Sequence, residues 1–183
     1  SHFLIQKAKS ILANEGLVVN FKEGDARKLP YQTDLFDFVT ILGNSFGYFE
    51  STDDDLKILK EVYRVLKPNG QFLIDVADGS YLKKNFMPRS WEWIDKKHFV
   101  CRERSLASDK ERLISREVVT NIEKGVIVDQ FYAERLYTEA VLRNLFKEVE
   151  CFFLNEEQND FQNPSIRYYE TKEKGHGRIE VRR

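Results

Sequence analysis

Residues 36–49 read FDFVTILGNSFGYF, and this stretch decides the fold class. Its first seven residues are almost continuously apolar and include β-branched side chains. Such a run is typical of a strand that is buried on both faces at the centre of a parallel sheet. The next residues, Asn44 to Tyr48, read as a loop. The stretch therefore predicts a buried strand in an α/β protein.

A helix and a second strand are expected on the C-terminal side of this stretch. Thr52 can cap a helix, and apolar residues recur at helical spacing from Leu56 to Leu66. The turn at 67–70 (KPNG) ends this helix, because proline cannot continue it and asparagine tolerates left-handed backbone angles. Residues 71–76 (QFLIDV) then have the composition of another buried strand.

The N-terminal side continues the alternation of helices and strands. Apolar residues recur at helical spacing over residues 4–12, and Gly16 is a stop signal. Residues 17–21 (LVVNF) read as a short strand, which Gly24-Asp25-Ala26 closes. This order implies βα units on a parallel sheet. The loops that follow the strands then lie along one sheet edge, where ligands usually bind.

The pattern changes at about residue 89. Three long segments mix polar and apolar side chains, at 99–106, 113–122 and 126–137, and turn residues separate them. They predict an antiparallel meander, residues 89–137, inserted into the α/β frame.

The α/β frame is expected to resume after the meander. Thr138 caps a short helix, and strands are expected at residues 149–154 and 166–171. The charged tail, residues 172–183, is expected to be loosely held or to face the solvent.

The composition argues against several classes of function. The chain has 183 residues, enough for a single domain, and its formal net charge of −1 gives no electrostatic basis for binding nucleic acid or an anionic membrane. Cys101 and Cys151 are far apart and have no neighbouring ligand residues, so no metal site is expected. Since no apolar run approaches the roughly 18 residues of a membrane helix, we expect a cytoplasmic protein.

Three segments together resemble the class I S-adenosylmethionine-dependent methyltransferase family. They are residues 19–26 (VNFKEGDA), 36–49 and 62–75 (VYRVLKPNGQFLID), and 138–154 is similar to the helix and strand that close the family's fold. The resemblance implies a single α/β domain over residues 1–183, with an incomplete Rossmann-like methyltransferase sheet and the meander as an insertion. It also implies S-adenosylmethionine as the cofactor.

The resemblance implies four residues that contact this cofactor. Asp25 matches the acidic residue that accepts a hydrogen bond from the adenine amino group, and the N–H of Ala26 would meet a ring nitrogen. Gly43 and Asn44 match the segment beneath the methionine portion, where a glycine allows close approach. A simpler interpretation of Asp25, an aspartate in a Gly-Asp turn, stays open.

Candidate residues for the methyl acceptor are less specific. Phe46 and Tyr48 are placed to form the walls of the cleft, because aromatic faces attract a sulfonium cation. In related small-molecule methyltransferases an insertion of this kind folds over the cleft, so the meander is expected to be a substrate cap. Arg102 and Arg135 within it can bind a carboxylate or phosphate. The alternatives are core aromatics and a solvated sheet face.

One element of the family is expected to be missing. The first β-α-β unit carries a Gly-rich cofactor turn and a ribose-binding acidic residue, and neither occurs in residues 1–183. We therefore expect a truncated form with an open sheet edge, which favours a homodimer through that edge.

Three hypotheses for the function remain. The first is S-adenosylmethionine-dependent methyl transfer to a small-molecule oxygen or nitrogen acceptor. The second is a non-catalytic methyltransferase-like module that acts through a protein partner or a dimer. A nucleotide-cofactor oxidoreductase is the third, because fold alone does not determine function. The absence of an Asn/Asp-Pro-Pro-Tyr pattern argues against amino groups of nucleic acids as the acceptor.

Overall fold

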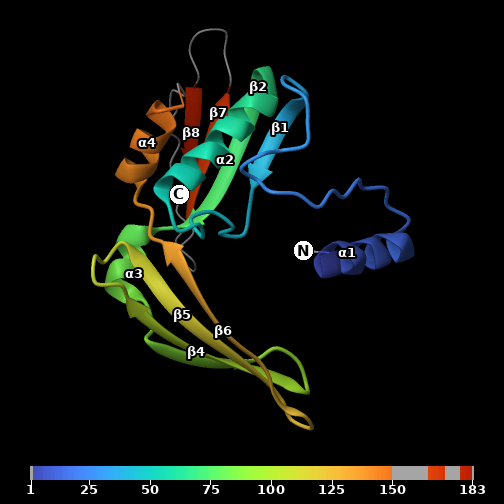
Figure 1. The fold of residues 1–183 in the computed structure, drawn as a ribbon, viewed down its shortest axis with the longest axis vertical. Helices are drawn as coiled ribbons and strands as arrows, with labels where there is room; N and C mark the ends of the chain where they lie inside the picture. Colours follow the sequence, from blue (N-terminus) through green and yellow to red (C-terminus); the bar gives the residue numbers. More distant parts are fainter. Residues whose placement is uncertain (1, 150–164, 172–177, 183) are drawn as a thin grey trace.

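The computed structural model describes residues 2–149, 165–171 and 178–182, which form two sheets and four helices (Figure 1). The first sheet, called here the core sheet, has the strand order β1-β2-β7-β8, and the second, the meander, has the order β3-β4-β5-β6. In chain order the elements are α1 (His2–Glu15), β1 (Phe36–Ile41), α2 (Thr52–Val65), β2 (Leu66–Ala77), α3 (Gly79–Asn85), β3 (Arg89–Trp93), β4 (His98–Leu106), β5 (Arg112–Asn121), β6 (Gly125–Arg135), α4 (Glu139–Lys147), β7 (Ser165–Thr171) and β8 (Arg178–Arg182).

The core sheet confirms the α/β class. β1 and β2 are parallel and are connected by α2, as expected for a βα unit. β7 pairs antiparallel with β2 on its other side, and β8 pairs antiparallel with β7. The arrows of β1 and β2 both point toward the meander (Figure 1). The loop after β1 therefore lies where the two sheets meet.

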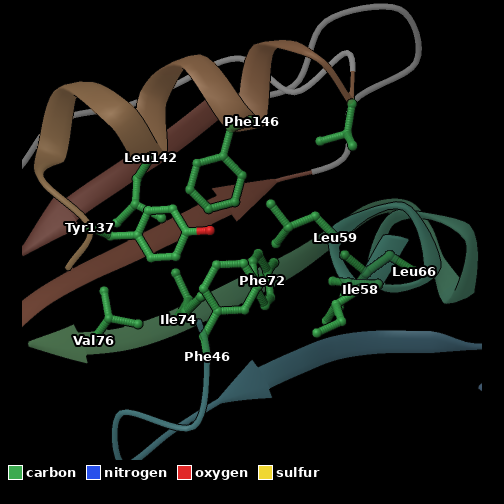
Figure 2. Packing of buried hydrophobic residues seen from close by; sticks show 12 residues of the cluster. Phe46, Ile58, Leu59, Leu66, Phe72, Ile74, Val76, Tyr137, Leu142 and Phe146 are labelled. Atoms are coloured by element: carbon green, nitrogen blue, oxygen red, sulfur yellow. The ribbon is translucent and has the colours of Figure 1, made fainter. Parts of the chain in front are cut away.

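The hydrophobic core lies between the core sheet and the helices α2 and α4 (Figure 2). Alternate residues of β2 point into it, because successive side chains of a strand face opposite sides. The apolar stripe of α2 packs on them, and Leu142 and Phe146 of α4 close the layer. The ring of Phe146 lies 6.2 Å from that of Phe72, in an edge-on arrangement. These residues bury one face of the sheet.

The prediction that residues 36–42 are buried on both faces was wrong. Val39 and Ile41 pack against the core, but Phe38 on the other face is 47% exposed. β1 pairs with β2 alone among the described strands, so it is an edge strand. An apolar strand becomes buried on both faces when helices cover both sides of the sheet, and α2 and α4 cover one.

The short strand predicted at residues 17–21 was also wrong. Residues 17–24 form no strand, and Val18 is 95% exposed. An apolar, β-branched sequence favours a strand only when a neighbouring strand accepts its hydrogen bonds, and the described chain places none beside it. α1, which the sequence did predict, stands apart from both sheets, and no residue of it is buried (Figure 1).

The antiparallel meander is confirmed. β4, β5 and β6 occupy the three predicted segments, and β3 adds a fourth strand. All three pairings are antiparallel. Turns that begin at Ala107 and Ile122 connect its last three strands, near the predicted positions. The strands extend away from the core sheet as a curved blade (Figure 1).

The helix caps confirm one prediction and correct another. Thr138 caps α4, as expected. The cap of α2 is Ser51 rather than Thr52, because the Ser51 side chain accepts a hydrogen bond from the N–H of Asp53. The turn predicted at residues 67–70 was wrong, because these residues lie within β2, where the register with β1 is irregular. Asn69 there has a φ of 66°, the left-handed conformation that asparagine tolerates.

The C-terminal part of the chain is described in pieces. The strand predicted at residues 166–171 is present as β7. Of the strand predicted at 149–154, only its first residue, Val149, lies within the described chain, and Val149 is part of a turn. Residues 178–182 of the tail form β8, a strand that the sequence did not predict. Their backbone pairs with the free edge of β7.

The chain leaves the meander through a tight crossing with the core. The N–H of Arg135 donates to the carbonyl of Gly47, and the N–H of Gly79 donates to that of Tyr137. A Cβ atom on Gly79 would lie 2.6 Å from the carbonyl carbon of Leu136. Since the two backbones touch here, the meander is held in one position against the core sheet.

Among the described residues, no helix is both long and apolar enough to cross a membrane. The same part of the chain holds no group of three or more side chains that could coordinate a metal ion.

Candidate functional site

The site is built around the turn that follows β1. Gly43 and Asn44 both adopt left-handed backbone angles, with φ of 65° and 54°, which glycine and asparagine tolerate best. The Asn44 side-chain oxygen accepts a hydrogen bond from the N–H of Ala77 at 2.9 Å, and its own N–H donates to the carbonyl of Asp75. Asn44 therefore ties together the carboxyl ends of the two parallel strands.

A carboxylate of the meander completes this turn. The Asn44 side-chain amide donates to Oε2 of Glu134 in β6, which also accepts from the Tyr48 hydroxyl at 3.4 Å. The ring of Tyr132, two residues before Glu134, lies 6.2 Å from that of Tyr48. Residues that are 90 positions apart in the sequence thus meet where the core sheet faces the meander.

The environment of Tyr48 gives a measurable signature. Burial, together with the Glu134 charge, raises the pKa of Tyr48 to about 12 from its usual 10. We expect Glu134→Gln to lower this pKa partway toward 10, because burial is the larger cause. Because the pKa of Tyr48 is higher in the folded state, its contribution to the stability of the fold is fully present below pH 10 and is lost as the pH rises through 12. Ring-carbon NMR of labelled tyrosine measures both values, and an unchanged pKa in the variant would contradict the contact.

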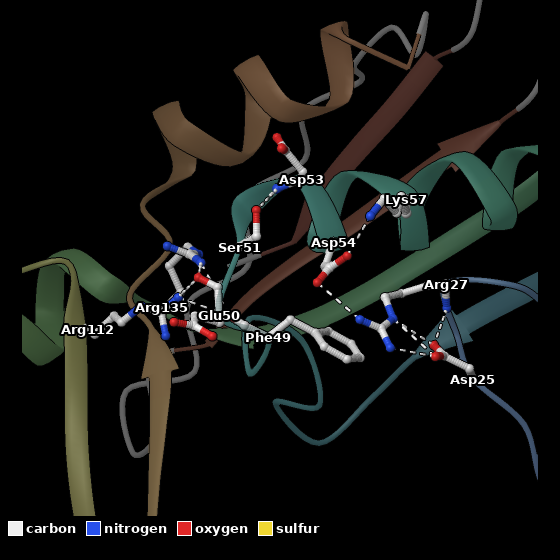
Figure 3. A network of polar contacts seen from close by, with 10 residues as sticks. All are labelled: Asp25, Arg27, Phe49, Glu50, Ser51, Asp53, Asp54, Lys57, Arg112 and Arg135. Carbon is white, nitrogen blue, oxygen red and sulfur yellow. Dashed lines mark hydrogen bonds and ion pairs between the residues drawn. The ribbon is translucent and has the colours of Figure 1, made fainter.

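Asp25 belongs to a second polar network, which connects the turn at residues 25–27 with the start of α2 (Figure 3). Its carboxylate accepts from the backbone N–H of Arg27 at 2.9 Å and from the Arg27 guanidinium at 2.7 and 3.1 Å. The same guanidinium donates to Asp54 in α2 and stacks 4.3 Å from the ring centre of Phe49. Arg27 therefore fixes the Asp25 turn to the start of α2.

This pairing keeps Asp25 ionised. The hydrogen bonds from Arg27 lower the pKa of Asp25 to about 2. Both of its oxygens already accept bonds, as in the simpler interpretation of a Gly-Asp turn, but the side chain remains exposed to solvent. The backbone N–H of Ala26 makes no hydrogen bond within the described part of the chain. An acceptor and a donor thus lie next to each other at the surface.

Two arginines of the meander hold the loop before α2 (Figure 3). Arg112 and Arg135 both donate to the carbonyl oxygens of Phe49 and Glu50. Arg135 also forms an ion pair with the fully buried Asp55 at 3.2 Å, and the Tyr137 hydroxyl donates to the same carboxylate oxygen at 2.6 Å. Burial and this carboxylate raise the pKa of Tyr137. These contacts give Arg135 an internal partner.

The other candidate acceptor residues lie apart from the turn. Phe46 is 2% exposed and belongs to the core, where its ring centre is 5.2 Å from that of Tyr137. Arg102 pairs with Glu92 and Glu117 within the meander. It lines a hollow of about 290 Å³ together with Trp91 and Cys101. The structure thus brings together Asn44 and Tyr48, and it leaves Phe46 and Arg102 elsewhere.

Sequence reasoning did not find Glu134, Arg27 or Asp55. Glu134 and its partners come from distant segments, and their meeting depends on how the meander docks. The role of Arg27 could have been predicted from the sequence, because a basic residue two positions after an exposed aspartate can fold back and pair with it. The buried position of Asp55 gives no local signal, since acidic residues are common in the first turn of a helix.

Known proteins match the N-terminal part of the chain. The family profile described as "Methyltransferase domain" matches residues 1–74. A ubiquinone/menaquinone biosynthesis C-methyltransferase from Pectobacterium atrosepticum is 37% identical over 73 residues, and a demethylmenaquinone methyltransferase from Lactobacillus johnsonii is 39% identical over 74. These matches support the resemblance to the class I S-adenosylmethionine-dependent methyltransferases. These matches cover 39% and 40% of the chain, and the chain spans 28% of the length of either relative.

Solved structures show the same fold over almost the whole chain. An S-adenosylmethionine-dependent methyltransferase from Clostridium acetobutylicum superposes with a TM-score of 0.76 at 19% identity, covering 96% of this chain and 73% of that one. A protein from Pyrococcus horikoshii gives 0.66 at 23% identity, covering 95% and 68%. Both likenesses extend through the meander, so the methyltransferase fold includes it.

The residues that are present would suit two parts of the cofactor, its adenine and its methyl end. Asp25 and Ala26 offer the acceptor and donor that an adenine edge requires. No atom lies within 4 Å of the place where a Cβ on Gly43 would stand, so a ligand can approach the backbone there. Residues 1–183 contain no Gly-rich turn of the Asp-x-Gly-x-Gly-x-Gly type. The fit therefore covers the adenine and methyl ends.

Proposed function

We propose that this protein takes part in methyl transfer from S-adenosylmethionine to a small molecule with an oxygen or nitrogen acceptor. The observation that carries the proposal is the Gly43–Asn44 turn. It lies at the carboxyl ends of the parallel strands, where α/β folds bind ligands, and it touches the meander through Glu134. An acceptor that binds between the sheets would lie beside this turn.

Each part of the chain has a distinct role in this proposal. Asp25 and Ala26 hold adenine, and Gly43 and Asn44 border the methyl group. The cofactor supplies a methyl group that is already activated by its sulfonium, so the protein contributes mainly position and orientation. The meander, residues 89–137, acts as the substrate cap, and the tight crossing at Gly79 keeps it in place.

Calorimetry with S-adenosylmethionine and S-adenosylhomocysteine tests the proposal. Both compounds are expected to bind, and Asp25→Ala is expected to weaken binding about 10-fold or more, because a charge-assisted hydrogen bond is lost. Asp37→Ala is the matched control, since Asp37 is an exposed aspartate at the opposite end of β1 and pairs with Lys67. No binding by the wild-type chain, or equal binding by the Asp25 variant, would contradict the proposal.

A second candidate function follows from the exposed edge of the core sheet. β1 has a free edge within the described chain, and the apolar side chains of Phe38 and Leu42 are largely exposed beside it. We propose, as the alternative, a methyltransferase-like module that pairs with another copy of itself through this edge. Sedimentation equilibrium would then show a dimer that Phe38→Lys dissociates. A monomer at all concentrations would contradict this alternative.

A further inference from the structure

Glu134 differs from the other acidic residues of the meander strands. Within the described part of the chain it forms no ion pair, and its second carboxylate oxygen, Oε1, accepts no hydrogen bond. The other four acidic side chains on β3–β6 all have an arginine partner: Glu92 with Arg102, Glu103 with Arg89 and Arg116, Glu117 with Arg102, and Asp129 with Arg116. Glu134 therefore carries a negative charge that no neighbouring side chain compensates.

The nearest cationic groups are turned elsewhere. Arg135, the next residue in β6, faces the opposite side and pairs with Asp55. Arg112 lies opposite Arg135 in β5, and its guanidinium is held by the carbonyl oxygens of Phe49 and Glu50. Because both arginines are fixed by these contacts, neither one neutralises Glu134.

The groups that do surround Glu134 suit an ammonium ion. The carboxylate lies beside Tyr48, which is 44% exposed, and the rings of Tyr48 and Tyr132 are 6.2 Å apart. A carboxylate gives an ammonium group a charge-assisted hydrogen bond, and aromatic faces attract the same cation. Asn44 holds the carboxylate in place through its amide. The carboxylate and the two rings thus lie side by side, and they are the groups that a cation would contact.

We propose that Glu134, Tyr48 and Tyr132 bind a protonated amino group of the methyl acceptor, so that the substrates of this protein are amines. The inference rests on the proposed function, because it places the acceptor beside the Gly43–Asn44 turn. It narrows that function to a nitrogen acceptor, an amine that is cationic at neutral pH. The bound ammonium group first gives one proton to the free Oε1 of Glu134. The nitrogen lone pair then bonds to the methyl carbon while the carbon–sulfur bond breaks, and S-adenosylhomocysteine leaves. The methionine portion of the cofactor also carries an ammonium group, and it is the second possible source of the same chemistry.

Measuring how three probes bind to the full chain distinguishes an amino group of the methyl acceptor from the ammonium group of the cofactor. The probes are benzylamine, benzyl alcohol as its neutral counterpart, and S-adenosylhomocysteine, and NMR titration measures each dissociation constant. Glu134→Gln removes the charge but keeps a carbonyl oxygen for the Asn44 amide, which preserves the turn. Glu103→Gln is the matched control, because Glu103 is an exposed glutamate on the opposite face of the same sheet. Circular dichroism verifies that both variants are folded.

We expect benzylamine to bind the wild-type chain at least 10-fold more tightly than benzyl alcohol does. Glu134→Gln is expected to abolish this preference, Glu103→Gln to keep it, and S-adenosylhomocysteine to bind all three proteins equally. Equal binding of the amine and the alcohol, or of the amine to both Glu134 forms, would overturn the inference. Loss of S-adenosylhomocysteine alone in Glu134→Gln would assign the carboxylate to the cofactor, which overturns the inference but leaves the proposed function standing.

Discussion

Gly79→Ala is expected to destabilise the protein by about 3 kcal/mol, the upper range for overpacking a rigid site. An added Cβ would lie 2.6 Å from the carbonyl carbon of Leu136 and 2.7 Å from the carbonyl oxygens of Leu136 and Tyr137. All three are backbone atoms, so no side-chain rotation relieves the clash. The substitution would push the exit of the meander away from the core. Urea denaturation followed by circular dichroism measures the loss.

Gly24→Ala is the control for this substitution. A Cβ on Gly24 would meet the Pro30 side chain at 3.7 Å, an ordinary van der Waals contact. Its effect is expected to stay within about 0.5 kcal/mol. If both variants unfold at the same urea concentration, the crossing is looser than the structure shows.

Arg135→Met is expected to cost about 3–5 kcal/mol, because it leaves the Asp55 carboxylate buried without its cation. The Arg135 side chain is 10% exposed and that of Asp55 is completely buried. The same substitution also frees the carbonyl oxygens of Phe49 and Glu50, which Arg135 holds. Urea denaturation of the variant, compared with the double variant Asp55→Asn/Arg135→Met, measures the coupling. The double variant is expected to be more stable than Arg135→Met alone.

Arg116→Met provides the comparison on the same sheet. Arg116 pairs with Asp129 in a bidentate but exposed arrangement. Exposed ion pairs contribute about 0–1 kcal/mol, so this variant is expected to lose far less stability. Similar losses in the two arginine variants would show that the Asp55 pair is not the buried anchor of the meander.

Much of the fold could be predicted because local pattern and tertiary structure agree. The apolar stripe of α2 and the mixed pattern of the meander each specify their element without reference to distant residues. The predictions for residues 17–21 and 36–42 were wrong for the same reason. Their apolar composition indicates neighbouring strands or helices that the described chain does not supply. Residues 17–21 therefore form no strand, and residues 36–41 form an edge strand.

The candidate site was predictable in part. Asp25, Ala26, Gly43 and Asn44 lie in short segments whose turn residues mark them, and the structure places them in such turns. The roles of Glu134 and Arg135 depend on how the meander docks, which involves hydrogen bonds between residues 80 and 90 positions apart. The periodicity of apolar residues within one helix or strand does not indicate contacts between distant segments. From the sequence, Arg135 is a candidate for ligand binding or for a solvated sheet face, whereas the structure shows an internal partner for its charge.

The position of the cofactor site tests the central claim most directly. Amide NMR of the labelled chain, titrated with S-adenosylhomocysteine, would show which backbone groups respond. We expect the largest shifts at Asp25, Ala26, Gly43 and Asn44, with none in the hollow beside Trp91 and Cys101. Shifts confined to that hollow, or no shifts at all, would contradict the assignment of a methyltransferase site to these two turns.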